Sequence, residues 1–105
     1  MRDEGVAVPE LHDIEMLASV RGRLHGRKIS ADTAHAILAD HAALTLSRHS
    51  HLELRSRIWE LRDNLTSYDA AYIALAERLG ATLITADSGM RAAPGIRCQV
   101  ELLTD

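Results

Sequence analysis

The chain has 105 residues, of which 47% are hydrophobic, 26% charged and only 3% aromatic, with no phenylalanine. This length supports one domain with a single core, which has to be built from leucine, alanine, isoleucine and valine. The formal net charge of −3 excludes a general attraction to nucleic acids or anionic membranes, so any contact with nucleic acid must be local.

The cysteine count and the hydrophobic runs indicate the compartment. Cys98 is the single cysteine and forms no internal disulfide, which favours a reducing cytoplasm. Residues 1–5 are charged and are not followed by the apolar segment of a signal peptide. No apolar run approaches the roughly 18 residues that a membrane span requires. We therefore expect a cytoplasmic protein without membrane contact.

Hydrophobic periodicity predicts strands that alternate with helices. Strands are expected at Val6–Val8, Leu44–Leu46, Thr82–Thr85 and Gln99–Leu102, and helices at Glu10–Leu24, Ser30–Ala43, Leu52–Arg62, Ser67–Leu79 and Ser88–Ala92. The helix at 67–79 is apolar almost all round, which predicts burial on several sides. This alternation is typical of a three-layer α/β/α fold with a mostly parallel sheet, and we expect a single domain over residues 1–105.

Asp69 stands at the start of the apolar helix, three residues after Thr66. The simpler interpretation is helix capping, because a threonine followed by an acid at this spacing stabilises a helix N-terminus. The alternative is a ligand site, because Asp69 begins a buried stripe with Tyr72 and Ile73, where a carboxylate needs a cation or hydrogen bonds. The sequence alone leaves both open.

Asp87 follows the strand expected at Thr82–Thr85 and precedes a short helix. Capping is again the simpler role. In α/β sheets, however, ligands bind beyond the carboxyl ends of the strands, and Thr85 offers a hydroxyl at that edge. Glu15 borders an apolar stripe and, taken singly, is better explained as a solvated helix residue.

Three acids at one sheet edge would supply oxygen ligands for a hard divalent cation, Mg²⁺ or Mn²⁺. Such an ion activates water and stabilises the charge that develops on a phosphodiester. A softer metal site from His12, His49 and His51 is less supported, because neither cysteine partners nor a helical HExxH pattern accompany it. The basic segment Arg21–Lys28 can guide phosphates or can simply be a solvated helix end.

Two segments resemble PIN-domain ribonucleases, in particular VapC-type toxins of bacterial toxin–antitoxin pairs: "VPELHDIEMLASVRGRL" and "DNLTSYDAAYIALAERLGATLITAD". The likeness runs from about Val6 to Leu103. It implies a metal-dependent endoribonuclease that binds Mg²⁺ or Mn²⁺ through a cluster of acids.

By this resemblance, Glu15, Asp69 and Asp87 match three acids of the family, and Thr85 matches the hydroxyl residue that often accompanies the last of them. The resemblance therefore implies that these acids are catalytic metal ligands and that Thr85 supports them. It also implies an RNA substrate, a VapB-like antitoxin as partner and a homodimer.

The N-terminus departs from the family pattern. The family opens with an apolar strand that ends in an aspartate. This chain begins Met1-Arg2-Asp3-Glu4, so no apolar strand precedes Asp3 and the family's first acid is not assigned to it. In the family that strand lies between those matching Val6–Val8 and Thr82–Thr85, and removing it exposes unpaired backbone groups. We expect an N-terminally shortened form, or a gap filled by another chain or a swapped element.

Two functions follow. The first is a Mg²⁺-dependent endoribonuclease of the VapC type. The rival, motivated by the unmatched first acid, is a non-catalytic PIN-like module that only captures an antitoxin or another protein.

Overall fold

A computed structural model describes residues 5–103, and the chain divides into two compact units, Met1–Arg48 and His49–Asp105. Asp3 lies outside the described residues. None of the described helices is both long enough and apolar enough to cross a bilayer. Each unit is taken by itself below.

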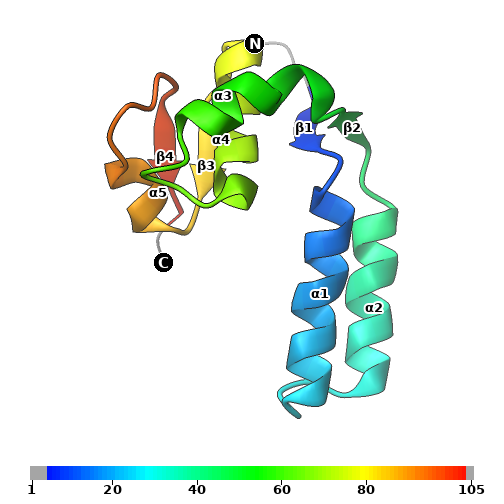
Figure 1. Ribbon diagram of the computed structural model, residues 1–105. Helices are drawn as coiled ribbons and strands as arrows, with labels where there is room; N and C mark the ends of the chain where they lie inside the picture. Colours follow the sequence, from blue (N-terminus) through cyan, green and yellow to red (C-terminus); the bar gives the residue numbers. More distant parts are fainter. Residues whose placement is uncertain (1–4, 104–105) are drawn as a thin grey trace. The chain divides into compact units, whose positions relative to one another are not determined.

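The first unit consists of two short strands and two helices that are joined by a short turn and pack against each other. Its elements are β1 (Val6–Pro9), α1 (His12–His25), α2 (Ala31–Ala42) and β2 (Leu46–His49). β1 pairs with β2, and α1 packs beside α2 (Figure 1). Each helix buries a single residue, Val20 in α1 and Ala34 in α2.

Local signals set the helix ends of this unit. The Ser30 side chain accepts a hydrogen bond from the Thr33 N–H at 3.1 Å, so Ser30 caps α2. α1 ends at His25 with Gly26 as its C-cap, and the left-handed conformation falls on Arg27, with φ 59°. The turn after α1 is therefore closed by a non-glycine residue.

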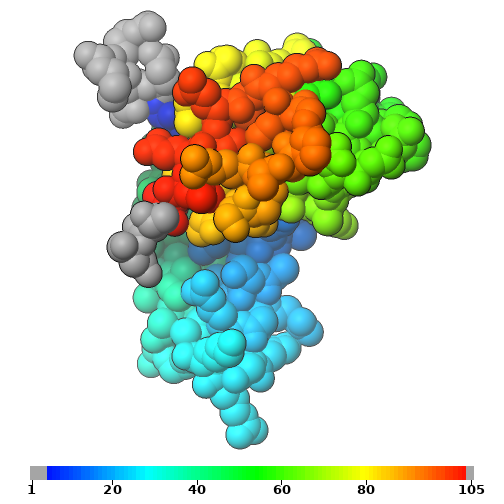
Figure 2. Space-filling view, turned by 90° about the vertical axis from the view of Figure 1, so that its left-hand side faces the viewer, coloured from blue at the N-terminus to red at the C-terminus, as the bar shows by residue number. Residues whose placement is uncertain are grey.

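The second unit is built around one buried helix. Its elements are the 3₁₀ turn η1 (Leu52–Leu54), α3 (Arg55–Glu60), α4 (Ser67–Leu79), β3 (Leu83–Thr85), α5 (Ser88–Ala92) and β4 (Val100–Leu102). Both α3 and β3 pack against α4. Figure 2 shows the segment from α5 to β4, orange to red, spread over one face of this unit.

The sequence of α4 explains its position. Six of its residues are buried, namely Ala70, Ala71, Ile73, Ala74, Leu75 and Ala76, because small and apolar side chains face neighbours on more than one side. Gly80 ends the helix in the left-handed conformation, with φ 62°, and the Ala81 N–H donates to the Ala76 carbonyl at 2.9 Å. This tight end turns the chain directly into β3.

β3 and β4 are parallel, with Leu83 opposite Val100 and Thr85 opposite Leu102. The connection between them contains α5, as a parallel pair requires. The mixed α/β class predicted from the sequence is confirmed. In the described part of the chain its strands pair as two two-stranded sheets, β1 with β2 and β3 with β4.

Several predicted bounds shift by one or two residues, and two elements differ in ways that the hydrogen bonding explains. The strand expected at Leu44–Leu46 instead begins at Leu46, because the Leu44 N–H donates to the His41 carbonyl at 3.1 Å and Leu44 stays in the turn that ends α2. The helix expected over 52–62 opens as a 3₁₀ turn and ends at Glu60.

Candidate metal and catalytic site

Asp69 lies in the first turn of α4 and is partly buried. Its backbone N–H donates to the Thr66 hydroxyl at 3.1 Å, so the predicted cap is present. A carboxylate in this turn is stabilised by the partial positive charge of the helix N-terminus. The cap engages the main chain of Asp69, and capping therefore does not exclude a ligand role for the side chain.

Asp87 caps α5. Its Oδ1 accepts a hydrogen bond from the Gly89 N–H at 2.8 Å, which confirms the capping interpretation. Within the described residues of this unit, Oδ2 has no hydrogen-bond partner. One carboxylate oxygen thus fixes the side chain, and the other remains available to a ligand.

Thr85 holds the turn between β3 and Asp87. Its hydroxyl accepts a hydrogen bond from the Asp87 N–H at 3.1 Å and donates to the sulfur of Met90 at 3.7 Å. Met90 is buried. The hydroxyl therefore links the turn that carries Asp87 to the core, and its support of a metal ligand stays a prediction.

Asp69 and Asp87 lie at the same end of the second unit. β3 follows α4 after a short turn and runs back along it, so the N-terminus of α4 and the carboxyl end of β3 lie at one end (Figure 1). Ala70, next to Asp69, and Met90, in α5, belong to one buried cluster. The two acids therefore flank the same piece of core.

Glu15 lies near the start of α1, in the first unit, and is partly buried. Its neighbour Ile14 is 68% exposed. Within either unit, the described residues contain no group of three or more histidine, cysteine, aspartate or glutamate side chains that could hold a metal. The predicted set of three acids thus takes one acid from the first unit and two from the second.

His12 has a partner that the sequence spacing did not indicate. Its Nε2 lies 3.0 Å from Nε2 of His41, and the two rings join α1 to α2. Burial, followed by the charge of His41, lowers the pKa of His12. Beside them, the Arg48 guanidinium binds both carboxylate oxygens of Asp13, at 2.5 and 2.9 Å, and lowers the pKa of that carboxyl.

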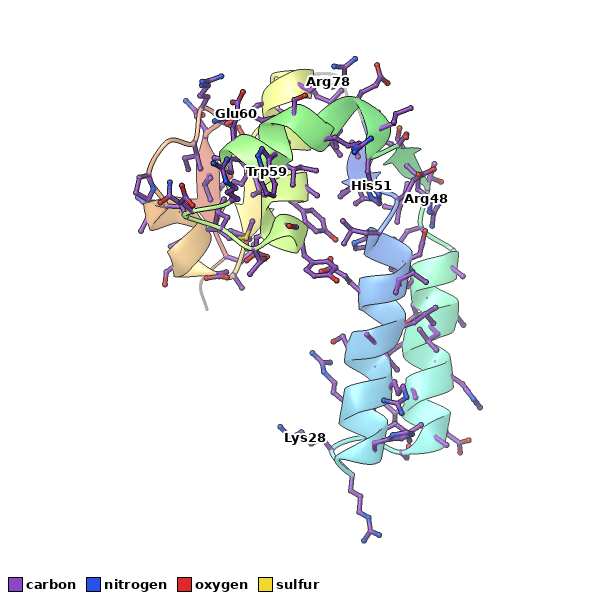
Figure 3. All side chains as sticks on the ribbon, in the orientation of Figure 1. Lys28, Arg48, His51, Trp59, Glu60 and Arg78 are labelled. Carbon is purple, nitrogen blue, oxygen red and sulfur yellow. The ribbon has the colours of Figure 1, made fainter. Side chains whose placement is uncertain are left out.

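The basic segment is fully consistent with a solvated helix end. Arg21, Arg23, Arg27 and Lys28 are all exposed, and Figure 3 labels Lys28 at the turn between α1 and α2. The alternative that these side chains guide phosphates stays a prediction.

An ion-pair network that the sequence patterns did not indicate joins α3, α4 and the loop before β4. The Arg57 guanidinium donates to both carboxylate oxygens of Glu77, at 2.7 and 3.0 Å, and to the Gly95 carbonyl at 2.6 Å. The Arg97 N–H donates to the same carboxylate at 2.6 Å. Burial acts to raise the pKa of Glu77, but these hydrogen bonds outweigh it and the pKa is lowered. Because the partners are 20 and 38 residues from Arg57, no local pattern could reveal them.

Comparison with known proteins agrees with the resemblance seen in the sequence. The PIN domain family profile matches residues 1–96, a range that spans both units. The chain is 38% identical over 96 residues to "Ribonuclease VapC1" of Mycobacterium tuberculosis, covering 90% of this chain and 72% of that protein.

Two further relatives from the same organism are similarly close. The chain is 33% identical over 100 residues to "Ribonuclease VapC9", covering 95% of this chain and 79% of that protein. It is 30% identical over 103 residues to "Ribonuclease VapC12", with coverages of 98% and 80%. The chain therefore belongs to the PIN domain family and is of the VapC type.

Proposed function

We propose that this protein is a Mg²⁺- or Mn²⁺-dependent endoribonuclease toxin in which Glu15, Asp69 and Asp87 hold the metal and Thr85 supports them. One observation carries the proposal: Asp69 and Asp87 flank the same buried cluster, at the carboxyl end of β3. The names of the relatives, all ribonucleases, support RNA as the substrate.

The chemistry of these side chains fits a hard divalent cation. Carboxylate oxygens are the donors that Mg²⁺ and Mn²⁺ prefer, and Oδ2 of Asp87 has no hydrogen bond within its unit's described residues. When bound, the ion supplies charge stabilisation for the phosphodiester and acidifies the attacking water.

The protein's own residues fix the donors in place. The Gly89 N–H immobilises the Asp87 side chain, and the Thr85 hydroxyl sets the turn that carries it. The capped first turn of α4 fixes the main chain of Asp69. Holding the donors before the ion arrives lowers the entropic cost of forming the site.

We further propose that the two units act together as one PIN domain over residues 1–105, in the cytoplasm. The family profile that spans both units supports the single domain. The relatives' VapC type supports a VapB-like antitoxin as partner. Ile14 and Leu17, exposed and apolar on α1, offer surface for such a partner or for a second copy in a homodimer.

RNA cleavage tests the assignment. With Mg²⁺ present, Asp69→Asn is expected to cut a mixed RNA at least about tenfold more slowly than the parent, because it removes one anionic donor. Asp63→Asn, an exposed acid outside the proposed site, is the matched control and should leave the rate unchanged. Equal rates for Asp69→Asn and the parent would refute the role of Asp69.

Calorimetry with Mn²⁺ separates this function from its rival. The nuclease predicts saturable binding that Asp69→Asn weakens or abolishes. A chain that binds no Mn²⁺ but captures a partner protein would instead be a non-catalytic PIN-like binding module.

A further inference from the structure

An exposed tryptophan in α3 is flanked in the sequence by two arginines, one in α3 and one in the turn that follows it. Trp59, the single tryptophan of the chain, is 67% exposed and is labelled on α3 in Figure 3. Arg55 precedes it by four residues, which is helical spacing on one side of α3, and Arg62 follows it by three, in the turn directly after α3; these three residues are called the stripe below. Both arginines are exposed.

Arg62 is already in contact with the tryptophan. Its guanidinium carbon lies 4.6 Å from the centroid of the Trp59 ring, and its Nη1 donates to the Trp59 carbonyl at 2.9 Å. One face of the indole is therefore covered by a cation, while most of the residue remains accessible. An exposed indole can stack on a flat ring of a ligand, and the arginine beside it attracts negative charge. The pair therefore favours a ligand that has both features.

The stripe stands on a fixed support. Leu54 and Leu61, which flank α3 at its two ends, are buried, and Ile58 within α3 is partly buried. Arg57 ties the same helix to Glu77 of α4. These contacts hold the backbone of α3 against the core, with Arg55 and Trp59 exposed to solvent.

We propose that Arg55, Trp59 and Arg62 form a grip for single-stranded RNA, in which the indole stacks on an unpaired base and the arginines neutralise the flanking phosphates. This grip deepens the ribonuclease function proposed above and rests on it. The net charge of −3 makes a local basic contact necessary for any RNA binding. Glu60, the acid next to Trp59, is paired with Arg57 at 3.1 Å, which reduces its repulsion of phosphate.

The test measures binding apart from cleavage. A fluorescein-labelled, unstructured RNA of about 12 nucleotides, within the range of sizes that single-strand sites cover, is titrated with the full chain in EDTA. Trp59→Ala is expected to raise Kd about tenfold, as the loss of one stacked base does, whereas Trp59→Phe, which keeps a ring, stays within about threefold. Unchanged thermal midpoints show that the variants fold.

Arginine variants separate a local grip from net charge. Arg55→Gln and Arg62→Gln are expected to raise Kd several-fold and to reduce its dependence on salt. Arg78→Gln removes the same charge from an exposed arginine of α4 that pairs with Glu53, and should leave Kd unchanged. An Arg78→Gln effect equal to that of Arg62→Gln would overturn the proposal.

The single tryptophan also reports binding directly. Stacking predicts that RNA quenches the chain's tryptophan fluorescence with the same Kd as the anisotropy titration. If Trp59→Ala binds RNA as tightly as the parent, the grip is refuted. If that variant also loses its complex with a partner protein, the stripe is a protein contact. If the parent binds RNA through Trp59 but does not cut it with Mg²⁺, the proposed nuclease fails while the grip stands.

Discussion

The two units use helices of similar length but bury them very differently. In the first unit, α1 and α2 each bury one residue, Val20 and Ala34. In the second, the 13-residue α4 buries six. Since burial of apolar surface is the main favourable term in folding, most of the packing energy lies around α4. Asp69 is therefore carried by the most deeply buried helix of the chain's described part.

The ion pairs repeat this contrast. The side chains of Arg48 and Asp13 in the first unit are 42% and 39% exposed, whereas those of Arg57 and Glu77 in the second are 18% and 11% exposed. Water screens the attraction between Arg48 and Asp13 and solvates both side chains, so this pair contributes little to stability. The second pair has given up much of its solvation, so each partner depends on the other.

The largest difference is expected from one pair of isoleucines. Ile73 of α4 is fully buried, and Ile73→Ala should lower the free energy of unfolding by about 3–4 kcal/mol through lost burial and the cavity left behind. Ile14→Ala, the same change at a residue that is 68% exposed on α1, should cost less than about 0.5 kcal/mol. Urea unfolding measures both, and similar costs would contradict the contrast between the units.

A smaller difference is expected from the two ion pairs. Arg57→Ala leaves the Glu77 carboxylate largely desolvated without its main partner, and should cost about 2–3 kcal/mol. Arg48→Ala removes the exposed partner of Asp13 and should cost less than about 1 kcal/mol. Denaturant unfolding of both variants is the measurement. A loss in Arg48→Ala as large as in Arg57→Ala would show that the first unit depends on its ion pair equally.

The smallest effect is a pH dependence confined to the first unit. Because the pKa of His12 is lowered in the folded chain, the unfolded chain takes up the proton more readily. The free energy of unfolding should therefore fall as the pH drops through the unfolded value of 6.5 towards the lower folded pKa.

Urea unfolding at about pH 7.5 and about pH 5.5, on either side of the ordinary histidine pKa, measures this loss. His12→Gln should show a smaller loss than the parent, while His35→Gln, an exposed histidine of α2, should behave like the parent. If His12→Gln loses as much stability as the parent, the dependence comes from other groups.

Where a structural feature depends on neighbouring residues, the sequence predicted it well. The caps by Thr66 and Asp87 lie where the residue types predicted them, and α4 ends at Leu79 as predicted. The strand at Leu44–Leu46 was misplaced because the hydrogen bonding at the end of α2 extended further than the apolar alternation indicated. The three acids of the candidate site stay a prediction.

Contacts between distant segments could not be derived in the same way. The Arg57–Glu77 pair, the His12–His41 contact and the hydrogen bond from Thr85 to Met90 all depend on how packed elements meet. The arginine–tryptophan stripe is a case between these two. The sequence shows the spacing of its residues, but only the structure shows that Trp59 is exposed.

The sequence by itself determined the α/β class, the ends of α4 and the family, since capping, hydrophobic period and motif spacing act over a few residues or are read directly from them. Only the tertiary structure decided which carboxylates are solvated, which are held by arginine, and which oxygen of Asp87 stays open. The physical reason is that the solvation and pKa of a side chain depend on everything packed around it, and most of those neighbours are remote in the chain.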